Sequence, residues 1–133
     1  MNEFEKPDFT FDLTKLTSGE LRQAIAAIDV DPPHAMSDSS AAEEVFPLVR
    51  LTGLQRQDAA CMRWANWVRV HAVGDLGDFA FASFAGIDVR LEGSAGDGVC
   101  EGMRRGVVRI TGSTGCGLGA AMIGGTLAVY GSA

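Results

Sequence analysis

Hydrophobic and polar side chains alternate over several short segments of this chain, and the alternation returns at a fixed interval. In residues 89–92, Val89 and Leu91 alternate with Arg90 and Glu92, as expected for a β-strand with one buried face. Residues 108–111 repeat the pattern 19 positions later. Three apolar series share this interval: Val70, Val89, Val108 and Leu127; Ala72, Leu91, Ile110 and Val129; Phe84, Met103 and Met122. A repeat of constant length therefore organises the second half of the chain.

Glycine follows the same interval. Two glycine series keep it: Gly74, Gly93, Gly112 and Gly131; Gly77, Gly96 and Gly115. Each unit thus holds an extended run, a glycine turn, a second short run and another turn. One such unit cannot bury its apolar side alone, whereas stacked units place like residues on one another and share a core. The pattern predicts an all-β solenoid with parallel strands and about four coils.

A strand and a helix are predicted before the repeats. Phe9 and Phe11 alternate with polar residues, as in a short strand, and Thr17 with Glu20 forms a capping box at the start of a helix. Leu16 and Leu21 occupy the positions of a hydrophobic staple, which packs the residue before the helix against its first turn. Leu21, Ala24, Ile25 and Ile28 recur at helical spacing and would form one apolar face. We expect it to end near Asp29, before a pair of prolines. Residues 1–48 would then be a strand–helix cap and acidic linker, and residues 49–133 the β-helix repeats.

The first coil is expected to be irregular, as terminal units of solenoids usually are. Residues 49–53 resemble residues 89–93, but the interval from Gly53 to Gly74 is two positions longer than the later ones. We expect Trp64 and Trp67 to pack between this coil and the cap, because large aromatic side chains chiefly fill cores. His71 and His34 have no evident acid or nucleophile beside them in sequence, so both are expected to lie on the surface.

Charge divides the 133-residue chain in two. Residues 1–48 hold 3 Lys or Arg against 10 Asp or Glu, and residues 49–133 hold 8 Arg against 7 acids, for a net charge of −6. An acidic total gives no reason to expect nucleic acid or an anionic membrane surface as partner. The sequence suggests no signal peptide and no run near the roughly 20 apolar residues that span a bilayer.

Cysteine usage favours a reducing compartment. Cys61, Cys100 and Cys116 are odd in number and not closely paired, which argues against a disulfide framework or a zinc knuckle. Cys100 is expected to alternate with Val99 and Glu101 as a small buried hydrophobe, so no nucleophile is inferred. We therefore expect a cytoplasmic protein in which this chain supplies no catalytic, cofactor-binding or metal-binding residue.

One glycine cluster raises the alternative of a dinucleotide-binding enzyme fragment. Gly115, Gly117 and Gly119 follow an apolar strand, as in the opening of a nucleotide-binding fold. Their spacing lacks the third glycine of G-x-G-x-x-G, no P-loop lysine follows, and residues 120–133 are too few for a βαβ unit of about 30 residues. The repeat accounts for the same glycines without a ligand, so this alternative ranks last.

The repeats resemble a known family. Residues 96–106, GDGVCEGMRRG, followed by VRITGS, are similar to the GXGXG repeat domain, the right-handed β-helix at the C-terminus of the large subunit of glutamate synthase. Similar repeats occur in one subunit of formylmethanofuran dehydrogenase and in one subunit of the formyltransferase/hydrolase complex. Residues 11–14 (FDLT), 21–25 (LRQAI) and 33–35 (PHA) look like the small stand-alone GXGXG subunit of glutamate-synthase-like complexes, typified by N-methylglutamate synthase. The repeat match spans about residues 68–133, and the N-terminal match lies within residues 11–35.

The resemblance implies a right-handed β-helix that acts as a non-catalytic scaffold. In such complexes a glutaminase-type amidotransferase subunit releases ammonia, a synthase subunit carries FMN and an iron–sulfur cluster, and the β-helix braces the two. This chain has no cysteine directly after its Met and no clustered cysteines, so both activities would lie on partner subunits. Membership in a formylmethanofuran dehydrogenase or formyltransferase/hydrolase complex, as its GXGXG-bearing component, is the alternative.

Two surfaces are candidate interfaces. The outward row of the repeats supplies Arg90, Arg109, Thr111 and Tyr130. The sequence also stops on a turn, where the family continues for several coils, which would expose Leu127 and Val129. We expect another chain to cover this end or the chain to self-associate there, and a fragment of a longer gene product is the alternative.

Overall fold

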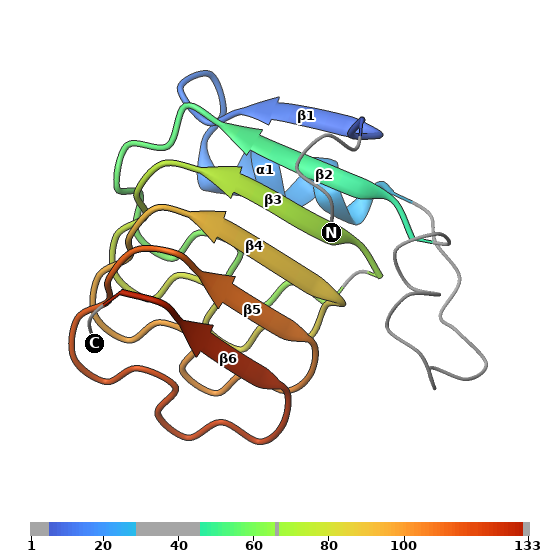
Figure 1. Ribbon diagram of the computed structural model, residues 1–133. Helices are drawn as coiled ribbons and strands as arrows, with labels where there is room; N and C mark the ends of the chain where they lie inside the picture. The colour runs from blue at the N-terminus through green and yellow to red at the C-terminus, as the bar shows by residue number, and fades with distance from the viewer. Residues whose placement is uncertain (1–5, 29–45, 66, 132–133) are drawn as a thin grey trace.

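The computed structural model of the chain describes residues 6–28, 46–65 and 67–131, which form one parallel sheet and one helix. The strands are hydrogen-bonded in sequence order (Figure 1). The elements are β1 (Phe9–Asp12), α1 (Ser18–Ala26), β2 (Leu48–Thr52), β3 (Arg69–Val73), β4 (Asp88–Glu92), β5 (Val107–Ile110) and β6 (Thr126–Val129).

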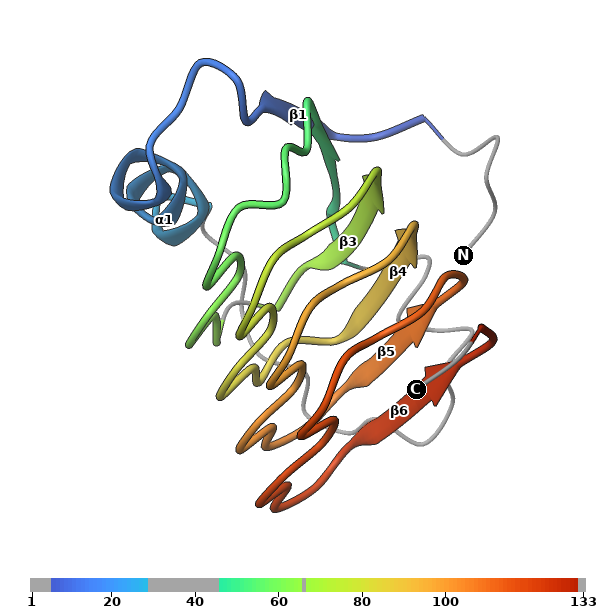
Figure 2. The same ribbon diagram turned by 90° about the vertical axis from the view of Figure 1, so that its left-hand side faces the viewer.

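The strands stack into a β-solenoid, as the repeat predicts. In Figure 1 the chain runs along each strand at the front, turns, and returns behind the sheet to the start of the next strand, with a right-handed sense. Figure 2 shows the coils from the side, each with a strand on one face and a folded segment at the back. The predicted all-β fold, a right-handed parallel β-helix with a strand–helix cap, is confirmed.

The register of the sheet follows the repeat interval. Val89 pairs with Val108, which pairs with Leu127, and Leu91 pairs with Ile110, which pairs with Val129. Val89, Leu91, Val108 and Ile110 are fully buried, and burial of such a side chain stabilises a fold by about 1.5–3 kcal/mol. Like residues thus lie on one another in register, as predicted. Leu51 pairs with Ala72, two positions beyond the regular interval, which confirms the irregular first coil.

The back of each coil differs from the extended run that the sequence suggests. Phe79, Phe81 and Ser83 have φ values of 59°, 58° and 55°, and Gly98, Cys100 and Gly102 have 69°, 58° and 66°. Every second residue is therefore left-handed, a conformation that favours glycine. Val99 and Cys100 are both buried, so the predicted alternation of buried and exposed side chains is wrong there, although Cys100 is a buried hydrophobe as predicted.

The cap forms as the sequence indicates. The Thr17 hydroxyl accepts from the Glu20 N–H at 3.1 Å, and the Glu20 carboxylate accepts from the Thr17 N–H at 3.0 Å, so both halves of the capping box are present. The helix ends at Ala26, slightly before Asp29, which lies outside the described residues together with His34. β1 pairs with β2 in parallel, so the cap also extends the sheet.

The two tryptophans have different environments. Trp64 is buried in the core that includes Leu21 and Ile25 of α1, as predicted. Trp67 instead stacks on Phe46 with 6.1 Å between ring centroids, and the Arg105 guanidinium lies 3.6 Å from the centroid of its ring. The predicted position of Trp67 between the first coil and the cap is therefore wrong. It packs in a separate cluster with Phe46 and Ile87.

Candidate functional site: the outer face of the sheet

The outer face of the sheet carries three arginines and a histidine in one row, in register. Arg50 pairs with His71, His71 with Arg90, and Arg90 with Arg109. These four residues, here called the cationic row after its three arginines, share one face because the residues on either side of each point into the core. Neighbouring parallel strands lie about 4.8 Å apart, so like charges in one row would repel without acids between them. The row is therefore a positively charged stripe along the solenoid axis.

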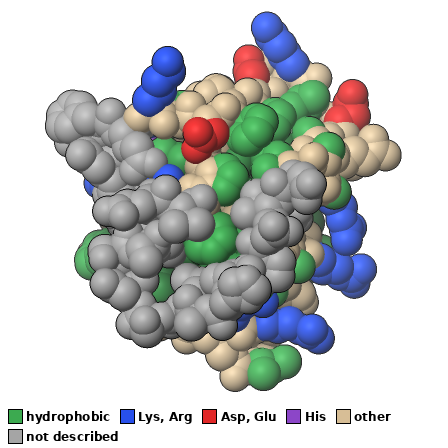
Figure 3. All heavy atoms as spheres, turned by 90° about the vertical axis from the view of Figure 1, so that its right-hand side faces the viewer, with side chains coloured by type: hydrophobic (Ala, Val, Ile, Leu, Met, Phe, Trp, Pro, Cys, Tyr) green, Lys and Arg blue, Asp and Glu red, His purple; other side chains and the backbone are tan. Residues whose placement is uncertain are grey.

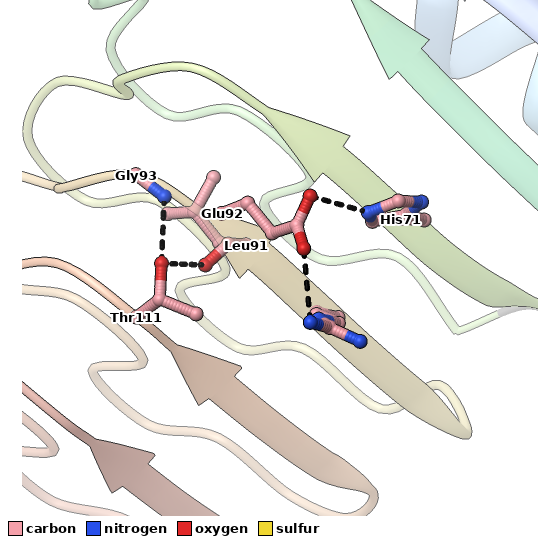
Figure 4. A network of polar contacts seen from close by, with 6 residues as sticks. His71, Leu91, Glu92, Gly93 and Thr111 are labelled. Carbon is pink, nitrogen blue, oxygen red and sulfur yellow. Dashed lines mark hydrogen bonds and ion pairs between the residues drawn. The ribbon is translucent and has the colours of Figure 1, made fainter. Parts of the chain in front are cut away.

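Two carboxylates at the ends of β4 hold this row in place. Glu92 Oε2 lies 3.0 Å from His71 Nε2, and Glu92 Oε1 lies 2.9 Å from Arg90 Nη2 (Figure 4). At the other end of β4, Asp88 Oδ1 lies 3.0 Å from Arg109 Nη1. Charge-assisted bonds of this kind fix the orientation of otherwise flexible side chains. The outer face thus presents Arg90 and Arg109 in fixed positions.

His71 is buried, with 4% of its surface exposed, so the prediction of a surface histidine is wrong. Its strand has a neighbouring strand on each side, and its residue position is in register with Arg50 and Arg90. Among the described residues, its Nδ1 has no hydrogen-bond partner. Arg69 on the same strand is also buried, and its Nε donates to the Phe46 carbonyl at 3.0 Å.

The predicted interface residues fall into separate groups. The side chains of Arg90 and Arg109 are 32% and 44% exposed and belong to the outer-face network. Thr111 lies beside them, where its hydroxyl accepts from the Gly93 N–H at 3.1 Å and donates to the Leu91 carbonyl at 3.4 Å (Figure 4). Tyr130 is 67% exposed, just after β6. Leu127 and Val129 belong instead to the interior rows, where both are half-buried.

Residue type alone does not reveal which side chains form the ion pairs and hydrogen bonds of the outer face. His71, Asp88 and Glu92 are absent from the interface predicted above, although the repeat interval places His71 one strand away from Arg90. The strand register implied by the repeat interval could have identified the row, because it specifies which residue of each neighbouring strand lies beside Arg90. The bond from Glu92 to His71 crosses diagonally from the end of β4 to the middle of β3, and the interval does not encode a diagonal contact.

The acidic side chains in the turns bond to the backbone of the following coil. Asp58 Oδ1 accepts from the Asp78 N–H at 2.7 Å, Asp78 Oδ1 from the Asp97 N–H at 2.8 Å, and Asp97 Oδ1 from the Cys116 N–H at 2.8 Å. These carboxylates therefore satisfy backbone donors at the corner of each coil. Within the described residues, no group of three or more His, Cys, Asp or Glu side chains could hold a metal ion.

The cysteines differ sharply in their environments. Burial raises the pKa of Cys100 to about 12, and burial also raises the pKa of Cys61 far above its ordinary value. Since the thiolate is the nucleophilic form, these two thiols are unreactive in the folded protein. Cys116 is exposed, and all three cysteines are free thiols.

The Gly115, Gly117 and Gly119 cluster forms the corner and back of a coil. A Cβ on Gly115 would clash with Asp97 Oδ1 of the coil above, while Gly117 and Gly119 have φ values of 74° and 65°. Between β5 and β6 the described chain contains no helix, so these residues do not open a βαβ unit. The stacking of coils therefore requires glycine at position 115, and the left-handed backbone favours it at positions 117 and 119.

The chain matches no protein-family model, no curated protein and no solved structure. Within the described ranges, no helix combines the length and apolar character needed to cross a bilayer.

Proposed function

We propose that this chain is a non-catalytic scaffold subunit of a glutamate-synthase-like complex, such as N-methylglutamate synthase. Its partners would be a glutaminase-type amidotransferase and a synthase subunit that carries FMN and an iron–sulfur cluster. The GXGXG-like repeats support the choice of complex, and the cationic row is the observation that supports a docking role. The three free cysteines are consistent with the cytoplasm as the compartment.

The outer face has the properties of a preformed docking surface. Arg90 and Arg109 are held by Glu92 and Asp88, so less side-chain freedom is lost when a partner binds. The backbone beneath them is fixed by continuous hydrogen bonding between neighbouring strands. A rigid surface of this kind can hold two partner subunits at a constant separation, which is what a brace requires.

The charge of this face predicts an acidic partner surface. Arg50, Arg90 and Arg109 are partly or fully exposed on this face, beside Asp88 and Glu92 of β4, although the whole chain has a net charge of −6. Complementary potentials steer association and suppress incorrect partners. We expect docking to weaken as the salt concentration rises, because exposed charges are then screened.

Affinity capture of the full chain at its native expression level tests the proposal. The expected companions are an amidotransferase and a flavin-dependent synthase subunit, whereas formyl-transferring subunits would favour the alternative complex. Arg109→Glu should reduce capture of the partners at least about tenfold, because it places a like charge beside the partner's acids. Arg104→Glu is the matched control, since Arg104 is exposed on the back of a coil.

The variants also define what would contradict the proposal. Equal loss of capture in both variants would show that total charge matters and the outer face does not. Thermal stabilisation of the isolated chain by NAD or NADP would instead support the dinucleotide-binding alternative, because a ligand of the folded state raises stability.

A further inference from the structure

A cavity of about 210 Å³ lies between α1 and the back of the first coil, which follows β2. Figure 2 shows α1 beside this coil, and Figure 3 shows hydrophobic side chains gathered at the top of the molecule, the end that carries the cap. The cavity is larger than an engineered apolar cavity of roughly 150 Å³ that binds benzene, and smaller than the roughly 300 Å³ at which drug-sized pockets begin. It therefore has room for one small ring with a short substituent.

The floor of the cavity is apolar and buried. It is formed by Leu13, Leu21, Ala60, Cys61 and Trp64, all of which belong to the hydrophobic core. Water in contact with such walls lacks hydrogen-bond partners, so an apolar group displaces it favourably. The floor therefore favours an apolar ligand over water.

The backbone identifies the residues of the second coil that correspond to this floor. The Trp64 N–H donates to the Cys61 carbonyl at 3.4 Å, and the Phe84 N–H donates to the Phe81 carbonyl at 3.2 Å. Cys61 and Phe81 also share a left-handed φ of 58°. Cys61 in the first coil thus corresponds to Phe81 in the second, and Trp64 corresponds to Phe84.

In the second coil the two corresponding side chains form an aromatic pair. The rings of Phe81 and Phe84 lie edge to face, with 5.9 Å between centroids and 82° between planes. In the first coil a thiol takes the place of one ring, and among the described residues Trp64 has no aromatic partner. Cys61 and Trp64 both line the cavity. An aromatic ring bound there would restore the missing pair, since aromatic rings favour edge-to-face contact.

The rim of the cavity carries one charged side chain. The polar side chains among its described residues are those of Thr17, Arg22 and Gln57. The Thr17 hydroxyl accepts from the Glu20 N–H, and the Gln57 side chain bonds to the backbone of its own turn. Arg22 is exposed, and within the described ranges its guanidinium forms no ion pair. A guanidinium at the rim favours a carboxylate, which it can bind through two parallel hydrogen bonds.

We propose that this cavity binds a small aromatic carboxylate, with its ring against Trp64 and its carboxylate at the Arg22 guanidinium. Phenylacetate represents the class, because its ring matches the phenyl group that Phe81 supplies in the second coil. A ligand held in this way contacts α1 and the first coil together, so it stabilises the cap on the solenoid. The inference does not rest on the proposed function, since it uses neither the outer face nor the repeat resemblance.

Calorimetric titration of the full chain with phenylacetate tests the cavity. We expect a single site with a dissociation constant of about 1 mM or lower, and a higher melting temperature at saturating ligand. In a Trp67→Phe background, the fluorescence of Trp64 should change with the same dissociation constant. Benzylamine, which has a similar size and the opposite charge, should bind at least about tenfold more weakly.

Charge at the rim is tested by a matched pair of variants. Arg22→Gln should weaken the binding of phenylacetate at least about fivefold, because the carboxylate loses its cationic partner. Arg63→Gln is the control, since Arg63 is an exposed residue of the same coil and lies outside the cavity lining, and it should bind as the parent does.

Two further variants fill the cavity. Cys61→Phe supplies the ring that Phe81 supplies in the second coil, at the same left-handed φ. Ala59→Phe fills a second lining position, whose counterpart in the second coil is Phe79, with φ values of 56° and 59°. Both variants should abolish the binding of phenylacetate, and circular dichroism shows whether each is folded.

Several results would overturn the inference. These are the absence of saturable binding up to about 10 mM phenylacetate, equal affinity for benzylamine, and unchanged affinity in a folded cavity-filling variant. Equal loss of affinity in Arg22→Gln and Arg63→Gln would also overturn it, because total charge and not the rim would then attract the anion.

Discussion

His71 Nε2 lies 3.0 Å from Glu92 Oε2, and the second oxygen of the same carboxylate lies 2.9 Å from the Arg90 guanidinium. One carboxylate therefore serves a buried imidazole and an arginine on neighbouring strands. Removing it would leave His71 without its described side-chain partner in a site that water hardly reaches. The cost of a lost partner is greatest where a polar group is buried.

The first prediction concerns this carboxylate. Glu92→Ala should lower the free energy of unfolding by about 1–3 kcal/mol, because the imidazole loses its partner and Arg90 loses its anchor. Glu101→Ala, an exposed position on the back of a coil, should change it by less than about 0.5 kcal/mol. Urea denaturation followed by circular dichroism measures both. Equal effects would show that the Glu92 network adds no stability.

The second prediction uses two equivalent left-handed positions. Gly102 and Ala121 hold the same place in successive coils and have φ values of 66° and 56°. Gly102→Ala should cost about 1 kcal/mol, and Ala121→Gly should gain up to about 1 kcal/mol, because an L side chain strains this conformation. A Cβ on Gly102 would make an ordinary contact of 3.4 Å with Ser83 Oγ, so backbone strain dominates.

Ala120→Gly is the control for this pair. Ala120 is exposed and is not among the left-handed residues, so glycine there should lower stability by about 0.5–1 kcal/mol through greater freedom of the unfolded chain. Thermal and urea unfolding would give the sign of each change. A destabilised Ala121→Gly variant would refute the strain argument.

The third prediction concerns thiol reactivity. In the folded protein one thiol per chain, Cys116, should react with a disulfide reagent at mildly alkaline pH, because burial raises the pKa of Cys61 and of Cys100. All three should react after denaturation. In Cys116→Ser the fast reaction should disappear. Rapid labelling of a second thiol in the folded chain would show that the core opens more readily than this packing allows.

The fourth prediction follows from the capping box. Hydrogen bonds from the Thr17 backbone N–H and then its hydroxyl hold the pKa of Glu20 below its ordinary 4.5. A lowered folded pKa means that the ionised carboxylate contributes stability above pH 4.5, and that this contribution is lost as the pH falls through the folded pKa. Glu20→Gln should therefore lose less stability than the parent on acidification.

Urea denaturation at a series of pH values measures this difference. Asp12 is a second carboxyl with a lowered pKa, chiefly through its hydrogen bond with the Thr14 hydroxyl, so Asp12→Asn should remove a separate share of the acid sensitivity. Identical pH profiles for Glu20→Gln and the parent would mean that the capping box does not couple to folding.

The sequence predicts this fold well where one residue type recurs at one interval. The pairing of Val89 with Val108 and Leu127 follows from the interval alone, because stacked coils must repeat their buried residues. The capping box is equally visible in the sequence, since its two residues are three positions apart and their bonds are local. Both features depend only on distance along the chain.

Other features depend on contacts that the interval does not encode. The sequence places His71 at the surface, but its ring is buried, in register with Arg50 and Arg90 and 3.0 Å from Glu92 Oε2. Trp67 meets Arg105 across an intervening coil, in which the glycine at the equivalent position, Gly86, has no side chain to separate them. The left-handed residues at the back of each coil resemble an extended run in sequence, because alternation looks the same in both conformations.

The unequal first coil shows how this architecture accommodates changes in length. Two additional residues between Leu51 and Ala72 are absorbed outside the strands, and every outward side chain keeps its direction. The height of the molecule and the chemistry of its faces are therefore independent. Tandem duplication of residues 93–111 would add one coil to the solenoid and leave the outer face of every other coil pointing in the same direction. Such a protein can therefore be lengthened along its axis to span a larger distance while the side chains on its faces stay the same.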